Sequence, residues 1–296
     1  MTRQIILTIA FLSFAIPFAA AQGLTVTYVD GTLEVQTAKG WKALDVGATI
    51  KTDARIRVSD SGTVELRRGS QHINILKDGQ YAVADLLAGS AQIKSRGVGV
   101  FLASKLHSVA SGNGQNTNAV GGVRGAAQGD NSQGLTWMGD DEDTSVKVRA
   151  LLDKQRFKEA ETEITQALGS AQDEQQKQDL EYLLASAYYG EGESARAYHA
   201  LITLKDNSAS TYYPDSIILK AQILLDNGSY ADSLSILKSF LGTNPGNQYS
   251  QVSCLLSALC YKGLGDLQSE KTALSTGYSL DPQSDTAQQI QKMQSE

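Results

Sequence analysis

The sequence predicts a chain of two parts that differ in fold class: a small all-β sandwich or roll, followed by an all-α solenoid of about four helix pairs. From Leu24 to about Trp137, apolar and polar residues alternate with a period of two, as they do in half-buried strands. From Thr144 onward the apolar residues follow the helical period, and a longer repeat of 36 or 37 residues runs through the same region. A length of 296 residues is enough for two ordinary domains.

Residues 1–21 have the features of a secretory signal peptide. A basic residue, Arg3, precedes an apolar run from Ile5 to Phe18, and small residues close the segment at Ala19-Ala20-Ala21. The run is short for a membrane span, which needs roughly 20 apolar residues. We therefore expect a periplasmic or secreted mature protein that begins near Gln22 and retains no membrane span.

Charge and cysteine content narrow the class of protein further. The net charge of −6 argues against a nucleic-acid partner, because such proteins normally carry a basic face. The two cysteines, Cys254 and Cys260, fall in one expected helix, where six residues separate their Cα atoms by about 9 Å. A disulfide needs less than about 7 Å, so two free buried thiols are expected.

The β part is expected over residues 22–137, with short strands separated by glycine-containing turns. Two of these turns are predicted at Asp30-Gly31 and Ser61-Gly62. The alternating segments are LTVTYV, TLEVQ, RIRV, TVELR, HINIL and QYAV. The part closes with a Gly/Asn-rich segment that contains the stretch NAVGGVRGAAQG.

This glycine-rich stretch does not match a phosphate-binding loop. Such a loop needs Lys and Ser or Thr after its last glycine, whereas Ala126 and Ala127 follow Gly125. We expect a structural motif that closes the β part, with the Arg124 side chain bonded to carbonyls or a carboxylate, and no cofactor. Its residues are Gly121, Gly122, Arg124 and Gly125.

An acidic linker is expected over residues 138–144, between two parts that should share few contacts. It contains the run Asp140-Asp141-Glu142-Asp143. Four consecutive acids do not distribute ligands around a cation, so no metal site is expected there.

The helical part is expected over residues 145–282, with a capping helix over 283–296. Each of four aligned segments is broken at a corresponding place, and a mostly small residue follows five positions later. The breaks are Gln155-Arg156, Gly192-Glu193, Gly228-Ser229 and Gly265-Asp266, and the later residues are Ala160, Ala197, Ser233 and the exception Glu270. This arrangement resembles the tetratricopeptide repeat, which implies a solenoid whose first helices line a concave groove.

The β part resembles the FecR-type domain. The resemblance rests on Gly31, Trp41, Leu44, Gly47, Ile50, Gly69, Ser70 and the segment from Ala119 to Gly125. Arg67-Arg68 departs from the family, which usually has an acid before the glycine-serine turn. FecR proteins are sensors joined to a membrane span and a cytoplasmic regulator. Neither is expected here, so the resemblance implies an envelope recognition module rather than signalling.

The leading functional expectation is a non-catalytic scaffold in the bacterial cell envelope that holds a protein or peptide partner in the helical groove. The three histidines, His72, His107 and His199, are scattered, and the sequence has no G-x-S-x-G, H-E-x-x-H or C-x-x-C motif. The aligned repeats place the partner-binding candidates towards the groove: Arg149, Tyr182, Ser186, Tyr189, Gln222, Asp226 and Lys262.

Two alternatives stay open. The first is a peptidoglycan- or carbohydrate-binding protein that uses exposed Tyr28, Trp41 and Tyr81 of the β part. The second, more remote, is a hydrolase with a carboxylate pair, which needs only spatial proximity.

Overall fold

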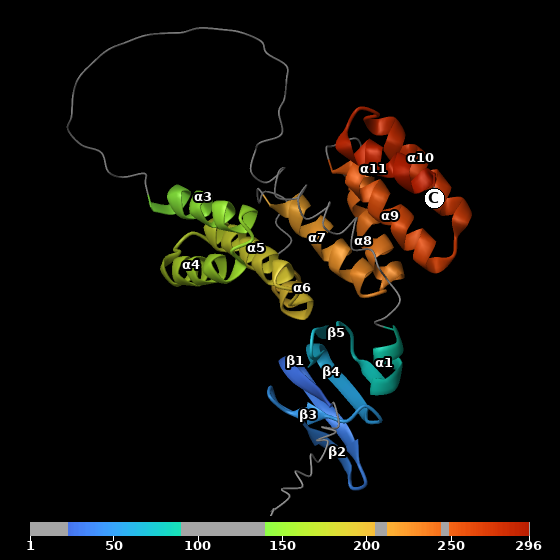
Figure 1. Cartoon of the computed structure of the whole chain (residues 1–296). Helices are drawn as coiled ribbons and strands as arrows, with labels where there is room; N and C mark the ends of the chain where they lie inside the picture. The colour runs from blue at the N-terminus through green and yellow to red at the C-terminus, as the bar shows by residue number, and fades with distance from the viewer. Residues whose placement is uncertain (1–22, 90–139, 205–211, 244–248, 296) are drawn as a thin grey trace, which may run out of the picture.

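The computed structural model describes residues 23–89, 140–204, 212–243 and 249–295. An amino-terminal antiparallel sheet is followed by a helical region, as Figure 1 shows in blue and in green to red. The prediction of a β part followed by an α part is therefore confirmed. Within the described residues, no helix has the length and apolar character that a membrane span requires.

The sheet has six strands in the order β2-β1-β4-β5, with β3 also paired to β1 and β6 also paired to β4. A short helix, α1 (Val83–Gly89), follows the last strand. The strands are β1 (Leu24–Thr37), β2 (Gly40–Ala43), β3 (Thr49–Ile50), β4 (Arg55–Arg68), β5 (Gln71–Ile75) and β6 (Gly79–Ala82).

Two predicted turns are wrong, because β1 and β4 each run through the glycine where a turn was expected. The register of the β1–β4 ladder shifts between Asp30 and Thr32, which marks a bulge. Gly31 has a φ of +77°, and a Cβ atom there would lie 2.7 Å from the Cα atom of Gly62. The two glycines therefore let the paired strands bend closely together instead of reversing the chain.

The bulge divides the sheet into two halves. In one half, the strand order is β3-β1-β4-β5, formed by the first half of β1 and the second half of β4. In the other half, the order is β2-β1-β4-β6, formed by the second half of β1 and the first half of β4. Alternation along these strands directs one set of side chains into a core of their own. That core contains Leu24, Val26, Leu33, Ile50, Ile56, Val58, Val64, Leu66, Ile73, Ile75 and Val83.

The helical region consists of successive helix pairs, in which α3, α5, α7, α9 and α11 also contact one another in that order. The first two pairs are α3 (Asp140–Asp153) with α4 (Phe157–Ser170) and α5 (Glu174–Gly190) with α6 (Ser194–Thr203). The next are α7 (Tyr213–Asp226) with α8 (Tyr230–Thr243) and α9 (Ser250–Leu264) with α10 (Leu267–Leu280), and α11 (Asp285–Gln294) follows.

The expected linker is helical from its third residue, because α3 begins at Asp140. The acidic run that the linker was expected to contain thus forms the first turn of α3.

The four predicted breaks fall at the turns inside the helix pairs. One residue in each turn has a left-handed backbone: Gln155 at φ 57°, Gly192 at 81°, Gly228 at 75° and Gly265 at 76°. Glycine suits this conformation because it has no Cβ atom, so Gln155 is the strained member of the series.

The residues five positions after the breaks are buried where helices cross. Ala160, Ala197, Ser233 and Glu270 are all buried, and the Ser233 hydroxyl donates a hydrogen bond of 2.8 Å to the carbonyl oxygen of Ala221. This bond ties α8 to α7. The free, buried state predicted for Cys254 and Cys260 is confirmed.

A glycine at the end of α5 allows two helix pairs to pack closely. A Cβ atom at Gly190 would lie 2.4 Å from the ring of Phe157 on α4. We expect Gly190→Ala to lower the free energy of unfolding by about 1–3 kcal/mol, because the ring must move.

The matched control is Gly242→Ala on α8, where a Cβ atom meets nothing within 4 Å. There we expect a gain of about 0.5–1 kcal/mol. Urea unfolding of both variants checks this, and an equal response at the two glycines would contradict the close packing.

The two parts of the chain contact each other. Helix α6 lies against strands β1, β4 and β5 of the sheet. His199 Nδ1 on α6 lies 3.0 Å from Asp30 Oδ2, and the ring of Tyr28 packs 6.4 Å from the His199 ring. Lys77 also forms an ion pair with Asp232 of α8. Helix α6 therefore covers part of the sheet face opposite the sheet core.

Candidate functional site

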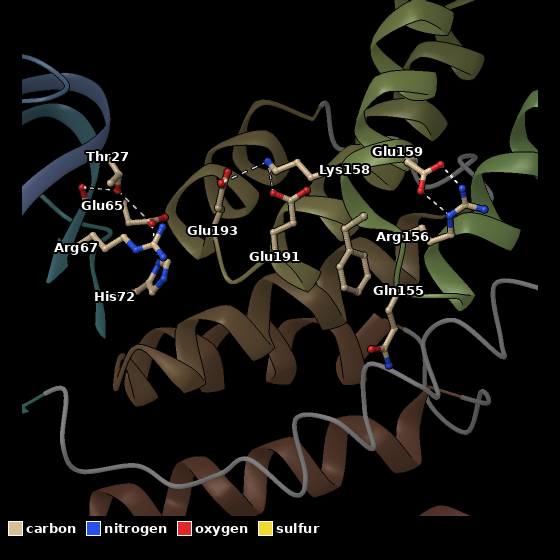
Figure 2. Close-up of a pocket in the computed structure, with 11 residues that line it drawn as sticks. Thr27, Glu65, Arg67, His72, Gln155, Arg156, Lys158, Glu159, Glu191 and Glu193 are labelled. Carbon is tan, nitrogen blue, oxygen red and sulfur yellow. Dashed lines mark hydrogen bonds and ion pairs between the residues drawn. The ribbon is translucent and has the colours of Figure 1, made fainter. Parts of the chain in front are cut away.

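A pocket of about 520 Å³ lies where the sheet meets the turns of the first two helix pairs. The sheet contributes Thr27, Glu65, Arg67 and His72 to its lining. The helical region contributes Gln155, Arg156, Phe157, Lys158, Glu159, Glu191 and Glu193. Figure 2 shows that these side chains approach the pocket from both parts of the chain.

Strand alternation places the sheet residues of the pocket. Leu66 points into the sheet core, so Glu65 and Arg67 on either side of it point to the opposite face, towards the helices. Glu65 is only 2% exposed, because α6 packs against this part of β4. Its Oε1 accepts hydrogen bonds from Thr27 Oγ1 at 3.2 Å and, with the Nδ1–H tautomer, from His72 at 2.9 Å.

The helical residues of the pocket come from two corresponding turns. Gln155 and Arg156 occupy the turn between α3 and α4, and Glu191 and Glu193 belong to the turn between α5 and α6. The left-handed backbone at Gln155 thus occurs in the pocket lining.

The basic side chains on the helical side are engaged by neighbouring carboxylates. Lys158 forms ion pairs with Glu191, with Glu161 at 3.1 Å and with Glu193 at 3.7 Å. The hydrogen bond to Glu191 raises the pKa of Lys158 above its usual value, so the ammonium group stays charged. Arg156 donates to both carboxylate oxygens of Glu159, one of them at 2.5 Å.

Two buried carboxylates of the pocket lining have an oxygen atom without a hydrogen-bond partner among the described residues. They are Oε2 of Glu65 and Oε1 of Glu191. Glu191 has a side chain only 9% exposed, and its Oε2 is held by Lys158. A buried acceptor without a donor costs free energy, so these atoms are the chemically distinctive feature of the pocket.

The predicted groove residues lie on α3, α5, α7 and α9, but three of them are buried instead of lining an open groove. Adjacent odd-numbered helices pack over the face that carries Tyr182, Ser186 and Gln222, and they bury these side chains. The ring of Tyr182 stacks on Tyr212 at 4.8 Å, and the Arg149 guanidinium lies 5.3 Å from the centre of the Tyr212 ring. Tyr182 and Arg149 are thus brought together around one aromatic ring.

A second group of predicted residues joins α5 to α7. The Tyr189 hydroxyl donates to Asp226 Oδ2 at 2.7 Å, and Gln222 Nε2 donates to Asp226 Oδ1 at 2.8 Å. Burial and the Asp226 carboxylate raise the pKa of Tyr189 far above its usual value, which keeps its hydroxyl proton available as a donor. Lys262 is exposed near the end of α9. These contacts connect successive helix pairs, so most of the predicted anchors serve packing.

One acidic residue in this region is fully enclosed. Asp215 is 1% exposed and accepts a 3.0 Å hydrogen bond from the Tyr249 hydroxyl at Oδ2, while Oδ1 has no partner among the described residues. Burial raises the pKa of Asp215 to about 7, against the opposing effect of the Tyr249 hydrogen bond. This carboxyl group therefore titrates near neutral pH, but it lies inside the helical core.

Other sequence candidates lie apart from one another. Tyr28 packs against α6, Trp41 lies under the guanidinium of Arg57 at 4.7 Å, and the Tyr81 hydroxyl donates to the Lys77 carbonyl oxygen. Tyr28 is thus in the contact between the two parts instead of on an exposed face. The glycine-rich motif at 121–125, with Arg124, and His107 lie outside the described residues.

Sequence reasoning missed Glu65 and Glu191. The alternation in TVELR does place Glu65 opposite the sheet core, but nothing local indicates that helices bury that face. Glu191 adjoins a predicted break, and its position beside Gly192 was the available signal.

Among the described residues, no group of three or more His, Cys, Asp or Glu side chains could hold a metal ion. The site is a pocket of mixed charge between the two parts of the chain. Two carboxylate oxygens buried in its lining have no hydrogen-bond partner among the described residues. In comparisons with known proteins, no family model matches the chain and no curated protein matches it.

Proposed function

We propose that the chain is a non-catalytic scaffold of the cell envelope, and that a protein or peptide partner binds where the sheet and the first two helix pairs meet. The observation that carries this proposal is the pocket of about 520 Å³ whose lining is shared by both parts. Pockets between two structural units are common places for ligand recognition.

The chemistry of the pocket supports recognition more than turnover. Arg156 and Lys158 are neutralised by glutamates, and His72 is engaged by Glu65. Charged side chains that are held in place by ion pairs can select a partner by charge complementarity.

The finer expectations from the sequence belong to the same proposal. The resemblance to the FecR-type domain suggests a recognition role for the β part, and the repeat of 36 or 37 residues supports a solenoid related to the tetratricopeptide repeat. The features of residues 1–21 support export to the periplasm or beyond the cell.

Photo-crosslinking in the producing cells tests the composite site. A benzophenone amino acid is placed at Arg67 on the sheet, at Arg156 on the helical side, at Lys262 on α9 and, as a distant control, at Lys292 on α11. We expect the first two positions to crosslink the same partner, identified by mass spectrometry, and Lys292 to crosslink none. If position 262 captures a partner while positions 67 and 156 do not, the partner binds the odd-numbered helices and the composite site is wrong.

A further inference from the structure

The pocket lining carries more carboxylates than permanent cations. Its lining has four glutamates, Glu65, Glu159, Glu191 and Glu193, against the three permanent cations Arg67, Arg156 and Lys158. Two of the glutamates keep a buried oxygen atom without a partner among the described residues. What these two carboxylate oxygens lack is therefore a hydrogen-bond donor, and a positively charged donor matches them best.

The resident cations do not supply that donor. Arg156 donates to Glu159, and Lys158 is shared among Glu191, Glu161 and Glu193. Arg67 is exposed, and its Nε donates to the carbonyl oxygen of Gly69 at 2.9 Å. An anionic ligand would compete with glutamates for Arg156 and Lys158 and would leave the two buried oxygen atoms unsatisfied.

One oxygen of Glu65 and one oxygen of Glu191 are already bonded, and this favours an ammonium group over a guanidinium group as the ligand. A guanidinium group binds best to both oxygens of one carboxylate in a bidentate pair. Here Thr27 and His72 already occupy Oε1 of Glu65, and Lys158 occupies Oε2 of Glu191. Each carboxylate thus offers a single oxygen atom, which suits an ammonium group because its three donors act independently.

We propose that this pocket binds a primary alkylammonium group, which donates to the free carboxylate oxygen of Glu65 or Glu191 while its methylene chain lies along Phe157. Phe157 is half-buried and is an apolar member of the pocket lining. The ammonium group belongs to a lysine side chain of a partner or to a free diamine. The inference rests on the proposed function, because it names the group through which a partner enters the composite site.

Calorimetric titration of the full-length protein tests the ligand class with small probes. The probes are Nα-acetyl-lysine N-methylamide, its neutral analogue Nα-acetyl-norleucine N-methylamide, Nα-acetyl-arginine N-methylamide and 1,5-diaminopentane. We expect the lysine amide or the diamine to bind about tenfold more tightly than the norleucine and arginine amides, as for one charged hydrogen bond. Preference for the lysine amide assigns a peptide source, and preference for the diamine assigns a small-molecule source.

Substitution then assigns the acceptors. Glu65→Gln and Glu191→Gln keep the side-chain shape, and at least one of them is expected to weaken ammonium binding about tenfold. The control is Glu163→Gln on α4, which breaks a 2.7 Å ion pair with Lys147 outside the pocket lining and should leave binding unchanged. Circular dichroism confirms folding of each variant.

Binding of the lysine amide and the diamine that is no tighter than binding of the norleucine amide, or ammonium binding that neither pocket variant weakens, would overturn the inference. So would tighter binding of the arginine amide. Crosslinking from positions 67 and 156 reports on the proposed function separately, because a partner captured there without ammonium binding leaves the composite site standing.

Discussion

Replacing Tyr182 with alanine is expected to lower the free energy of unfolding by about 3–5 kcal/mol, as for other large buried aromatic residues. Its side chain is 4% exposed and stacks on Tyr212 with ring centres 4.8 Å apart. The substitution removes this stack and leaves a cavity between α5 and the start of α7 that rigid helices do not close. Chemical unfolding followed by circular dichroism measures the loss.

The conservative variant Tyr182→Phe separates packing from the hydroxyl group. It keeps the ring and should retain most of the stability, with a loss of about 1 kcal/mol at most. If the alanine variant unfolds within 1 kcal/mol of the wild type, Tyr182 is not a packing residue, and its assignment to an accessible groove regains support.

A pH-dependent loss of stability is expected from Asp215. Its pKa is raised by burial from 3.8 to about 7 in the folded protein. Between these values the folded state holds a proton that the unfolded state releases, so stability falls as pH rises from about 4 to about 7. A difference of about 3 pKa units corresponds to about 4 kcal/mol, and the loss is complete above the folded-state pKa.

Asp215→Asn should remove this dependence. The asparagine side chain can still accept the Tyr249 hydrogen bond and has no charge to bury. We expect the variant to be more stable than the wild type above pH 7, by up to about 4 kcal/mol, and similar to it near pH 4. Urea unfolding at pH 4, 5.5, 7 and 8 measures the effect, with exposed Asp153→Asn as the matched control. A slope that persists in Asp215→Asn would assign the pH dependence to other groups.

The helix pairs were the most predictable part of the fold. Their turns need a left-handed residue, so Gly192, Gly228 and Gly265 mark them in the sequence, and the period then predicts the fourth turn at Gln155. Small residues five positions later follow from the close crossing of helices, with Ser233 as the clearest case.

The path of the sheet strands was less predictable, because the same glycine-containing dipeptides occur both in turns and in bulges. Asp30-Gly31 and Ser61-Gly62 are typical of turns, yet they bend two long paired strands at a bulge. The choice depends on whether both glycines meet across the ladder, which is a tertiary contact between distant residues.

The candidate site was predictable only in part for the same reason. The residues expected to line a groove do lie on odd-numbered helices, but burial of three of them by neighbouring helices depends on how the pairs stack. The burial of Glu65 likewise depends on α6 covering a strand far away in the sequence.

The position of the sheet along the row of helix pairs has a consequence for how such a chain can change in length. The sheet rests on α6, and the pocket takes its residues from the sheet and the first two pairs. A whole helix pair inserted or deleted after α6 leaves every pocket residue in place, because repeat units contact mainly their neighbours. A pair inserted between α4 and α5 would instead separate Lys158 from Glu191. The carboxyl-terminal pairs are thus the region where the chain can vary in length without disturbing the pocket.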